Sequence, residues 1–531
     1  MGTNTYRQQH SHPISIRRNN RHQYACFLIL WVCTTLTLTS CRETVVTSGE
    51  LPPIWPDYIG VTIPAGIAPL DFGIEGDWDA VYAEVKGNNG QTVKARGRWA
   101  RFNIRRWHRL TEGSTGSDLS VTVAARQGKR WTQFRPFFIH VSTDSLTDYG
   151  VVYRKIAPGY ETYSKIGNYQ RDIHTFRENP IIESTLTPGQ CVNCHTANAT
   201  DPEQYTFHLR GKHGATYFQV GDAHKWVTTK TDQTISNAVY PYWHPSGDYC
   251  ACSNNYIHQS FWTARERLIE VWDDASDISV VDVRSDEVIT SPLVHTDYYE
   301  TYPAFSPDGQ TLYYCTSYPY PVPARASEVR YDLCSISFDA TTGTLGSRVD
   351  TLIHAAAAGK SVTFPRPSYD GRFILYCEAD FGCFPIDHQE ADLWLYEVAT
   401  GNCWPLDGAN SNYAESFHNW SSNSRWILFS SRRHDGLYSL LYICHVDENG
   451  VASKPFLLPQ RNPQKYYGES LYSYNVPDFT KRRVQFNATY TWREVSSDER
   501  VQATPKDPNI LNNETENIDS SLSPSADRFM Q

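Results

Sequence analysis

The chain has 531 residues, a net charge of -10 and 13% aromatic residues. This length predicts two or three domains, each able to bury its own core. The 34 Tyr and 15 Trp favour β structure, and because no long basic stripe accompanies them, nucleic acid is excluded as an expected partner.

Residues 1–40 have the pattern of an export leader. Basic residues precede a short apolar run at 25–32, which is too short to span a bilayer comfortably. The run leads to Leu-Thr-Ser-Cys, which resembles a bacterial lipobox, so Cys41 is predicted to be the lipid-carrying first residue of the mature protein. A plain signal peptide with an incidental cysteine is the alternative. We therefore expect a protein of the bacterial cell envelope, attached by lipid to the periplasmic face or the cell surface.

The next segments differ in composition. Residues 41–70 are rich in proline and predict an extended tether. Residues 71–150 contain short alternating or apolar runs separated by Gly- and Asn-rich turns, which predict a small β-sandwich. Residues 151–215 are irregular and predict a connector that carries a cysteine motif. Residues 491–531 are polar and are expected to form a disordered tail.

Residues 216–490 contain a repeated unit. Each copy has an aromatic or apolar entry, a turn of the Ser-Pro-Asp-Gly type and an apolar run of β character. The copies are "YPYWHPSGDYCACS" at Tyr240, "YPAFSPDGQTLYYC" at Tyr302, "FPRPSYDGRFILYC" at Phe364, "FHNWSSNSRWILFS" at Phe417 and a degenerate "VPDFTKRRVQF" at Val476. A second pair of strands follows each of the first four, so every unit predicts one four-stranded blade of a β-propeller.

The units resemble those of the TolB-like, WD-repeat-like propellers of exported bacterial proteins, whose blades carry a similar Tyr-Pro-x-Trp-Ser-Pro-Asp-Gly signature. The resemblance covers about half of the chain and implies six blades, although only five copies are recognisable. The strands "ATYFQV" and "KWVTTKT" near residues 215–230 are expected to close the ring with the copy at Val476. The predicted fold is therefore mainly β, with a sandwich, a short haem c segment and a five- to six-bladed propeller.

The cysteine motif Cys191-Val192-Asn193-Cys194-His195 has the spacing of a c-type haem attachment site. The two thiols would bind one haem covalently, and His195 would be the proximal iron ligand. The predicted export leader places the motif in the compartment where such attachment occurs. Three alternatives remain: a zinc site, a thioredoxin-like dithiol and a structural disulfide between Cys191 and Cys194.

The chain contains only two methionines, one at the start and one in the polar tail, which argues against a His/Met haem. The sixth iron ligand is then another histidine or an open position. His208 is the first candidate distal ligand, with His213 and His224 as alternatives.

These features predict a lipid-anchored electron carrier or haem-based redox protein with a propeller as binding platform. The alternative is a non-enzymatic scaffold or ligand-binding propeller that contacts a protein or glycan, in which the cysteine motif is structural. An enzyme is less expected and would be a haem-dependent oxidoreductase. Fold resemblance does not identify the redox partner or the substrate.

Overall fold

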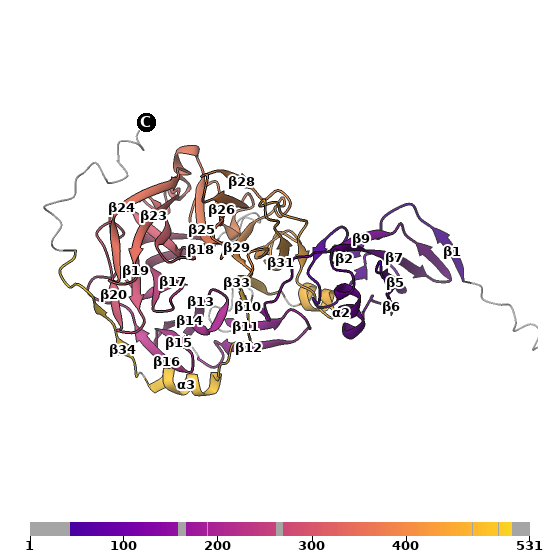
Figure 1. The fold of residues 1–531 in the computed structure, drawn as a ribbon, viewed down its shortest axis with the longest axis horizontal. Coiled ribbons are helices and arrows are strands. Elements are labelled where there is room, and N and C mark those ends of the chain that lie inside the picture. Colours follow the sequence, from indigo (N-terminus) through magenta and orange to yellow (C-terminus); the bar gives the residue numbers. More distant parts are fainter. Residues whose placement is uncertain are drawn as a thin grey trace, which may run out of the picture.

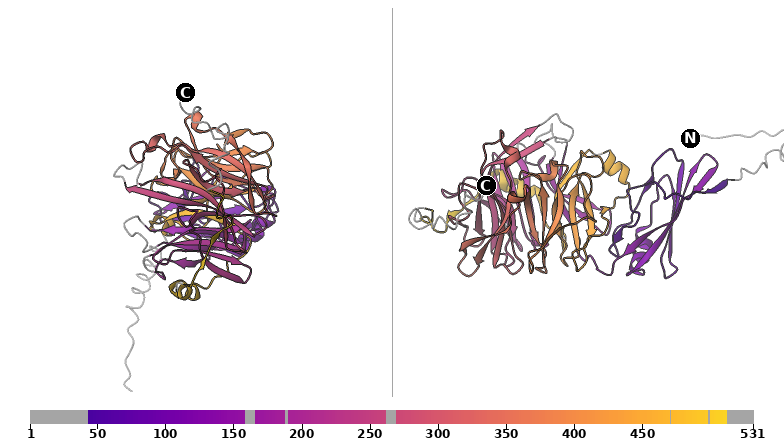
Figure 2. Two further views of the ribbon diagram at one scale, coloured as in Figure 1. Left: turned by 90° about the vertical axis from the view of Figure 1, so that its left-hand side faces the viewer. Right: turned by 90° about the horizontal axis from the view of Figure 1, so that it is seen from above.

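The computed structural model describes residues 43–157, 166–187, 190–261, 269–469, 471–497 and 499–511. It is mainly β, as predicted. An N-terminal domain lies beside a ring of six sheets, each built on four antiparallel strands (Figures 1 and 2). The ring is a six-bladed β-propeller.

The N-terminal domain is built on a branched sheet in which β7 pairs with three other strands. The sheet contains β1 (Thr44–Thr47), β3 (Thr62–Ile63), β5 (Ala80–Lys86), β6 (Thr92–Gly97), β7 (Ser117–Gln127), β8 (Arg130–Gln133) and β9 (Phe137–Val141). A separate pair joins β2 (Ile54–Trp55) to β4 (Gly73–Ile74). Burial alternates along β5 and β7, so one face of the sheet forms the core.

One helix of this domain was not predicted. The sequence predicts only strands between residues 71 and 150, but β6 ends at Gly97 and α2 spans Ile104–Glu112. The Asn103 side chain accepts a hydrogen bond from the Arg106 amide and caps the helix. Trp107 and Leu110 are fully buried, so packing of this short amphipathic face stabilises the helix.

The prediction of a tether at residues 41–70 is wrong for most of that segment. Tyr58, Val61, Ile67 and Leu70 are almost completely buried in the core of the N-terminal domain. The prolines favour extended backbone, but the apolar residues between them bury enough surface to dock the segment.

The six blades are listed here from the innermost strand outward. Blade 1 contains β33 (Ser473–Thr480), β10 (Gly150–Ile156), β11 (Ile166–Asp172) and β12 (Glu178–Glu183). Blade 2 contains β13 (Gln190–Asn198), β14 (Asp201–Gly211), β15 (Ala215–Val220) and β16 (Ala223–Thr228). Blade 3 contains β17 (Ala238–Trp243), β18 (Tyr249–Phe261), β19 (Ile269–Asp282) and β20 (Glu287–Ile289).

The remaining three blades follow in chain order, as the repeats predict. Blade 4 contains β21 (Tyr299–Phe305), β22 (Thr311–Ser317), β23 (Asp332–Asp339) and β24 (Thr344–Ile353). Blade 5 contains β25 (Ser361–Pro367), β26 (Phe373–Ala379), β27 (Asp392–Glu397) and β28 (Cys403–Pro405). Blade 6 contains β29 (Glu415–Trp420), β30 (Trp426–Ser431), β31 (Leu440–His445) and β32 (Phe456–Leu457). Short helices lie in the loops: η1 (Ala326–Glu328), η2 (Ala356–Ala358), η3 (Pro385–Asp387) and the π-helix η4 (Gln464–Gly468).

The ring closes differently from the prediction. β33 pairs antiparallel with β10, from Gly150 opposite Thr480 to Ile156 opposite Ser473, and these strands lie side by side in Figure 1. The strands at 215–220 and 223–228 belong instead to blade 2. Residues 151–215 are therefore not a connector: they supply strands of the first two blades, and the propeller begins near residue 150 rather than 216.

The C-terminal segment is ordered beyond the predicted boundary at residue 491. α3 spans Ala488–Ser497, and β34 (Val501–Gln502) and β35 (Thr504–Pro505) add parallel strands to the outer edges of blades 2 and 3. Backbone pairing to these edges orders a polar segment that has little apolar surface of its own. Residues 512–531 of the predicted tail lie outside the described residues.

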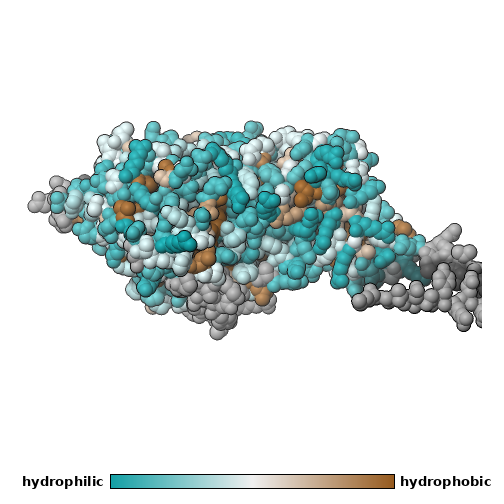
Figure 3. Space-filling model, turned by 90° about the horizontal axis from the view of Figure 1, so that it is seen from below, coloured by the Kyte–Doolittle hydropathy of each residue, from teal (hydrophilic) through white to brown (hydrophobic). Residues whose placement is uncertain are grey.

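The face of the molecule in Figure 3 is mostly hydrophilic, with small scattered apolar spots. None of the helices in the described ranges is both long and apolar enough to cross a bilayer.

Candidate functional site

Each innermost strand of the propeller carries a two-residue bulge at the same position. In every blade, the pairing between the innermost strand and the second strand shifts register at the bulge. In blade 1 this shift lies between the pairs Val152–Asp478 and Arg154–Asn475. The first residue of each bulge has a positive φ: Cys194 (52°), Tyr240 (49°), Tyr302 (54°), Phe364 (54°), Phe417 (48°) and Val476 (50°). Positive φ is uncommon outside glycine, so six such residues at equivalent positions mark one repeated feature.

The cysteine motif is the missing copy of the repeat. Cys194 occupies the position of Tyr240 in the next blade, and His195 occupies the position of Pro241. This copy is hard to recognise in the sequence because it lacks the Ser-Pro-Asp-Gly turn of the other copies. A tight turn at Ala199 and Thr200, both with positive φ, leads instead into the next strand, β14. The motif therefore lies within the propeller, whereas the sequence had placed it between domains.

The bulge residues converge on the propeller axis. The ring centroids of Tyr302 and Phe364 are 4.0 Å apart, those of Tyr240 and Tyr302 are 4.7 Å apart, and those of Phe364 and Phe417 are 5.1 Å apart. Such contacts form an aromatic plug made of residues from four blades.

We use the term axial pocket for the cavity of about 80 Å³ that this plug borders. Bulge residues from five of the six inner strands line it: Cys194, His195, Tyr240, Pro241, Phe364, Phe417, His418, Val476 and Pro477. Its size suits several water molecules or one small organic molecule. Sequence reasoning found Cys194 and His195, but it could not show that they share a cavity with His418 and Val476.

Two buried imidazoles face the axial pocket. His195 is 3% exposed; the carbonyl of Val152 lies near it, but neither ring nitrogen has a partner at hydrogen-bonding geometry among the described residues. His418 Nε2 lies 2.7 Å from the carbonyl oxygen of Phe364, whereas its Nδ1 has no partner in the described part of the chain. Burial, with a smaller contribution from a nearby arginine, lowers the pKa of each histidine from 6.5 to about 3. Both rings are therefore neutral at physiological pH.

Charged side chains complete the wall of the pocket. Arg154 of β10, Arg210 of β14 and Arg366 of β25 line it together with Asp478 of β33. These residues come from four strands that are separated in the sequence. No local motif could therefore have revealed the cluster. Burial raises the pKa of Asp478 to about 6.

The arrangement does not fit a covalently bound haem. Attachment requires both thiols of the motif to reach one porphyrin and the adjacent imidazole to reach its iron. Cys194 and His195 line the axial pocket, but Cys191 does not. Pockets that hold drug-sized ligands have volumes of about 300–1,000 Å³. The axial pocket, at about 80 Å³, is therefore too small for a porphyrin. Both thiols of the motif are free and buried.

His208 is not brought to the pocket that His195 lines. It lies on the second strand of blade 2, opposite Asn193, and its Nδ1 is 3.0 Å from Thr216 Oγ1. His224 lies near the outer edge of the same blade and pairs with Glu494. Within the described ranges, no three His, Cys, Asp or Glu side chains form a group that could hold a metal ion. Cys41 lies outside the described residues.

Comparison with known proteins gives only distant structural matches. No protein-family model and no curated protein sequence matches the chain. Among solved structures, TolB from Acinetobacter baumannii is 12% identical over 67% of this chain and 86% of that chain, with a TM-score of 0.37. Prolyl oligopeptidase B from Galerina marginata is 8% identical over 55% of this chain and 40% of that chain, with a TM-score of 0.35. An oligogalacturonate lyase from Vibrio parahaemolyticus is 10% identical over 54% of this chain and 84% of that chain, with a TM-score of 0.28.

Proposed function

We propose that this protein is a TolB-like propeller that binds a small molecule in the axial pocket, with the cysteine motif serving as part of the inner wall. One observation carries this proposal: bulge residues from five blades surround a single cavity, and two of them, His195 and His418, have buried imidazole nitrogens without partners among the described residues. Buried polar groups in proteins nearly always have hydrogen-bond partners. A bound molecule would supply them.

The half of the motif that enters the bulge has a structural explanation. Cys194 adopts the positive φ that the bulge requires, and its amide donates a 2.9 Å hydrogen bond to Asn193 Oδ1. Asn193 Oδ1 also accepts a hydrogen bond from Arg154. Asn193 thus joins the backbone of the bulge to a side chain of the pocket wall, and this role needs no haem.

The proposal is tested by filling the pocket. Val476→Phe places an aromatic ring where Tyr240 and Phe364 already stand in other blades, so the bulge should accept it. Native mass spectrometry of the purified protein, followed by identification of released small molecules, should find a ligand in the wild type and not in Val476→Phe. The control, Val451→Phe, changes a residue that is 61% exposed and should keep the ligand.

Three results would contradict the proposal. Equal occupancy in Val476→Phe would place the ligand elsewhere. A c-type band in the pyridine haemochrome spectrum would support the competing proposal of a covalent haem with an electron-transfer role. If the wild type carried no ligand and a small-molecule library gave no thermal shift, the scaffold alternative would be favoured.

We also propose that the protein is exported and held at the membrane by lipid on Cys41. The leader pattern of residues 1–40 and the lipobox-like Leu-Thr-Ser-Cys support this. In fractionated cells, the wild type should be found in the membrane fraction and Cys41→Ser should not. Retention of Cys41→Ser in the membrane would contradict lipid attachment at this residue.

A further inference from the structure

The wall of the axial pocket has an excess of positive charge. Three arginines line it, and Asp478 is the one acidic residue among the side chains described there. Within the described ranges, neither Arg154 nor Arg366 forms an ion pair with a carboxylate. Burying a guanidinium without an ion-pair partner is costly, so a bound anion would stabilise these side chains.

Asp478 offsets only part of this charge: it attracts Arg366 electrostatically but forms no ion pair with it in the described part of the chain. Its Oδ2 accepts hydrogen bonds from the Ala197 amide (3.1 Å) and from Thr196 Oγ1 (3.3 Å). Its Oδ1 accepts one from Asn419 Nδ2 (2.8 Å). Burial raises its pKa to about 6, although the Ala197 amide and the charge of Arg366 oppose this shift. The carboxyl group links blades 1, 2 and 6 and is already satisfied by neutral donors.

Residues of the pocket wall also have hydrogen-bonding groups without partners in the described part of the chain. Arg154 Nη1 donates to Asn193 Oδ1, but the Nε of this arginine is buried without a partner among the described residues. His195 and His418 each present at least one ring nitrogen in the same condition. Arg366 donates one hydrogen bond, 2.9 Å long, to the carbonyl oxygen of Pro365. Planar guanidinium groups of this kind suit the two oxygens of a carboxylate.

The other part of the pocket is apolar. Phe364, Phe417, Tyr240 and Val476 present rings and methyl groups to the cavity. A hydrated inorganic anion gains nothing from such a surface, whereas an organic anion can bury its hydrocarbon part against it. The volume of about 80 Å³ limits that part to a few carbon atoms.

We infer that the ligand of the axial pocket is a small organic acid, whose carboxylate lies toward Arg154 and Arg366 and whose short apolar body lies against the aromatic plug. This inference rests on the proposed function and names the chemical class of its ligand. No covalent step is involved.

The test compares three probes of similar size by isothermal titration and ligand-observed NMR: butyrate, its neutral analogue butyramide, and inorganic phosphate. Butyrate should bind more tightly than either of the others. Arg366→Gln should weaken butyrate binding about tenfold or more, because it removes a charged hydrogen-bond donor. Arg366→Lys should lose less, since it keeps the charge. The control, Arg372→Gln, changes an exposed arginine of the same blade and should leave binding unchanged.

The outcomes separate this inference from the proposed function. If butyramide binds as tightly as butyrate, and Val476→Phe abolishes both, the pocket binds ligands but the acid class is wrong. Tighter binding of phosphate than of butyrate would also overturn the organic acid. If butyrate affinity survives both Arg366→Gln and Arg154→Gln in folded protein, the assigned contacts are wrong. Circular dichroism and thermal midpoints check that each variant is folded.

Discussion

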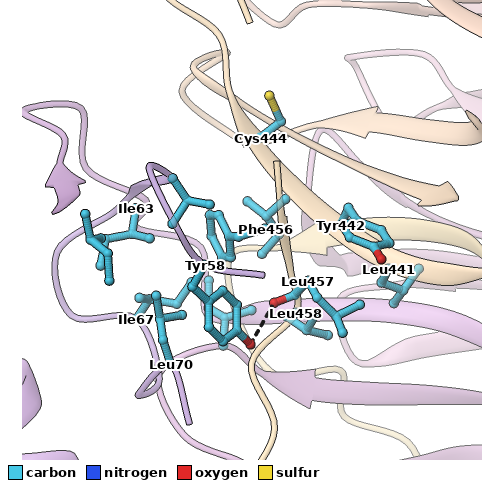
Figure 4. Close-up of a cluster of buried hydrophobic side chains, with 14 of the residues drawn as sticks. Tyr58, Ile63, Ile67, Leu70, Leu441, Tyr442, Cys444, Phe456, Leu457 and Leu458 are labelled. Atoms are coloured by element: carbon cyan, nitrogen blue, oxygen red, sulfur yellow. Dashed lines mark hydrogen bonds between the residues drawn. The ribbon is translucent and has the colours of Figure 1, made fainter. Parts of the chain in front are cut away.

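Replacing Phe456 with alanine should destabilise the whole molecule, because this residue belongs to a core that the two domains share. Figure 4 shows the shared cluster, in which Tyr58, Ile67 and Leu70 of the N-terminal domain lie against Phe456 and Leu457 of blade 6. Tyr58 donates a 3.4 Å hydrogen bond to the carbonyl oxygen of Leu457. The contact therefore joins the outer edge of the last blade to the segment that the sequence predicted to be a tether.

The magnitude follows from burial. Phe456 is 0% exposed, and truncation of a fully buried Phe to Ala costs about 3–5 kcal/mol, because apolar contacts are lost and a cavity remains. The matched control is Phe138→Ala on β9, where the side chain is 57% exposed and the cost should stay within about 0.5 kcal/mol.

Urea unfolding, followed by tryptophan fluorescence and far-UV circular dichroism, measures both variants. For Phe456→Ala the two signals should shift together, since one cluster stabilises both domains. A loss below about 1 kcal/mol would refute the shared core as the source of stability. So would a shift in the N-terminal domain alone, because the propeller would then not depend on the contact.

Two further predictions concern the propeller. His388 lies 3.1 Å from Glu270; burial lowers its pKa, but hydrogen bonds to Glu270 and Glu390 raise it more, from 6.5 to about 9. The raised pKa contributes about 3 kcal/mol to the free energy of unfolding. This contribution is fully present below pH 6.5 and is lost as the pH rises to about 9. The urea midpoint should therefore fall over this pH range in the wild type and stay constant in His388→Gln. Gly309→Ala should destabilise the protein more than Gly359→Ala in urea. Both glycines have a φ near 74°, but a Cβ at Gly309 would clash with His244 Nε2, whereas nothing lies within 4 Å at Gly359. Equal losses would show that the contact with His244 is unimportant.

The candidate site shows how far local patterns reach. The sequence drew attention to Cys194 and His195 through their spacing, and both do line the axial pocket. It assigned them to a haem because a five-residue motif carries no information about its neighbours in space. Arg154, Arg366 and Asp478 lie on three strands that are far apart in the sequence and share no motif, so only the closed ring brings them to one cavity.

The sequence by itself determined the mainly β composition and the blades that begin at Tyr240, Tyr302, Phe364 and Phe417, because tight turns and alternating strands are properties of adjacent residues. Only the tertiary structure decided that there are six blades and that the cysteine motif belongs to one of them. The pairing of β33 with β10 joins residues more than three hundred positions apart. Such a contact depends on every blade between them, and no local pattern encodes it.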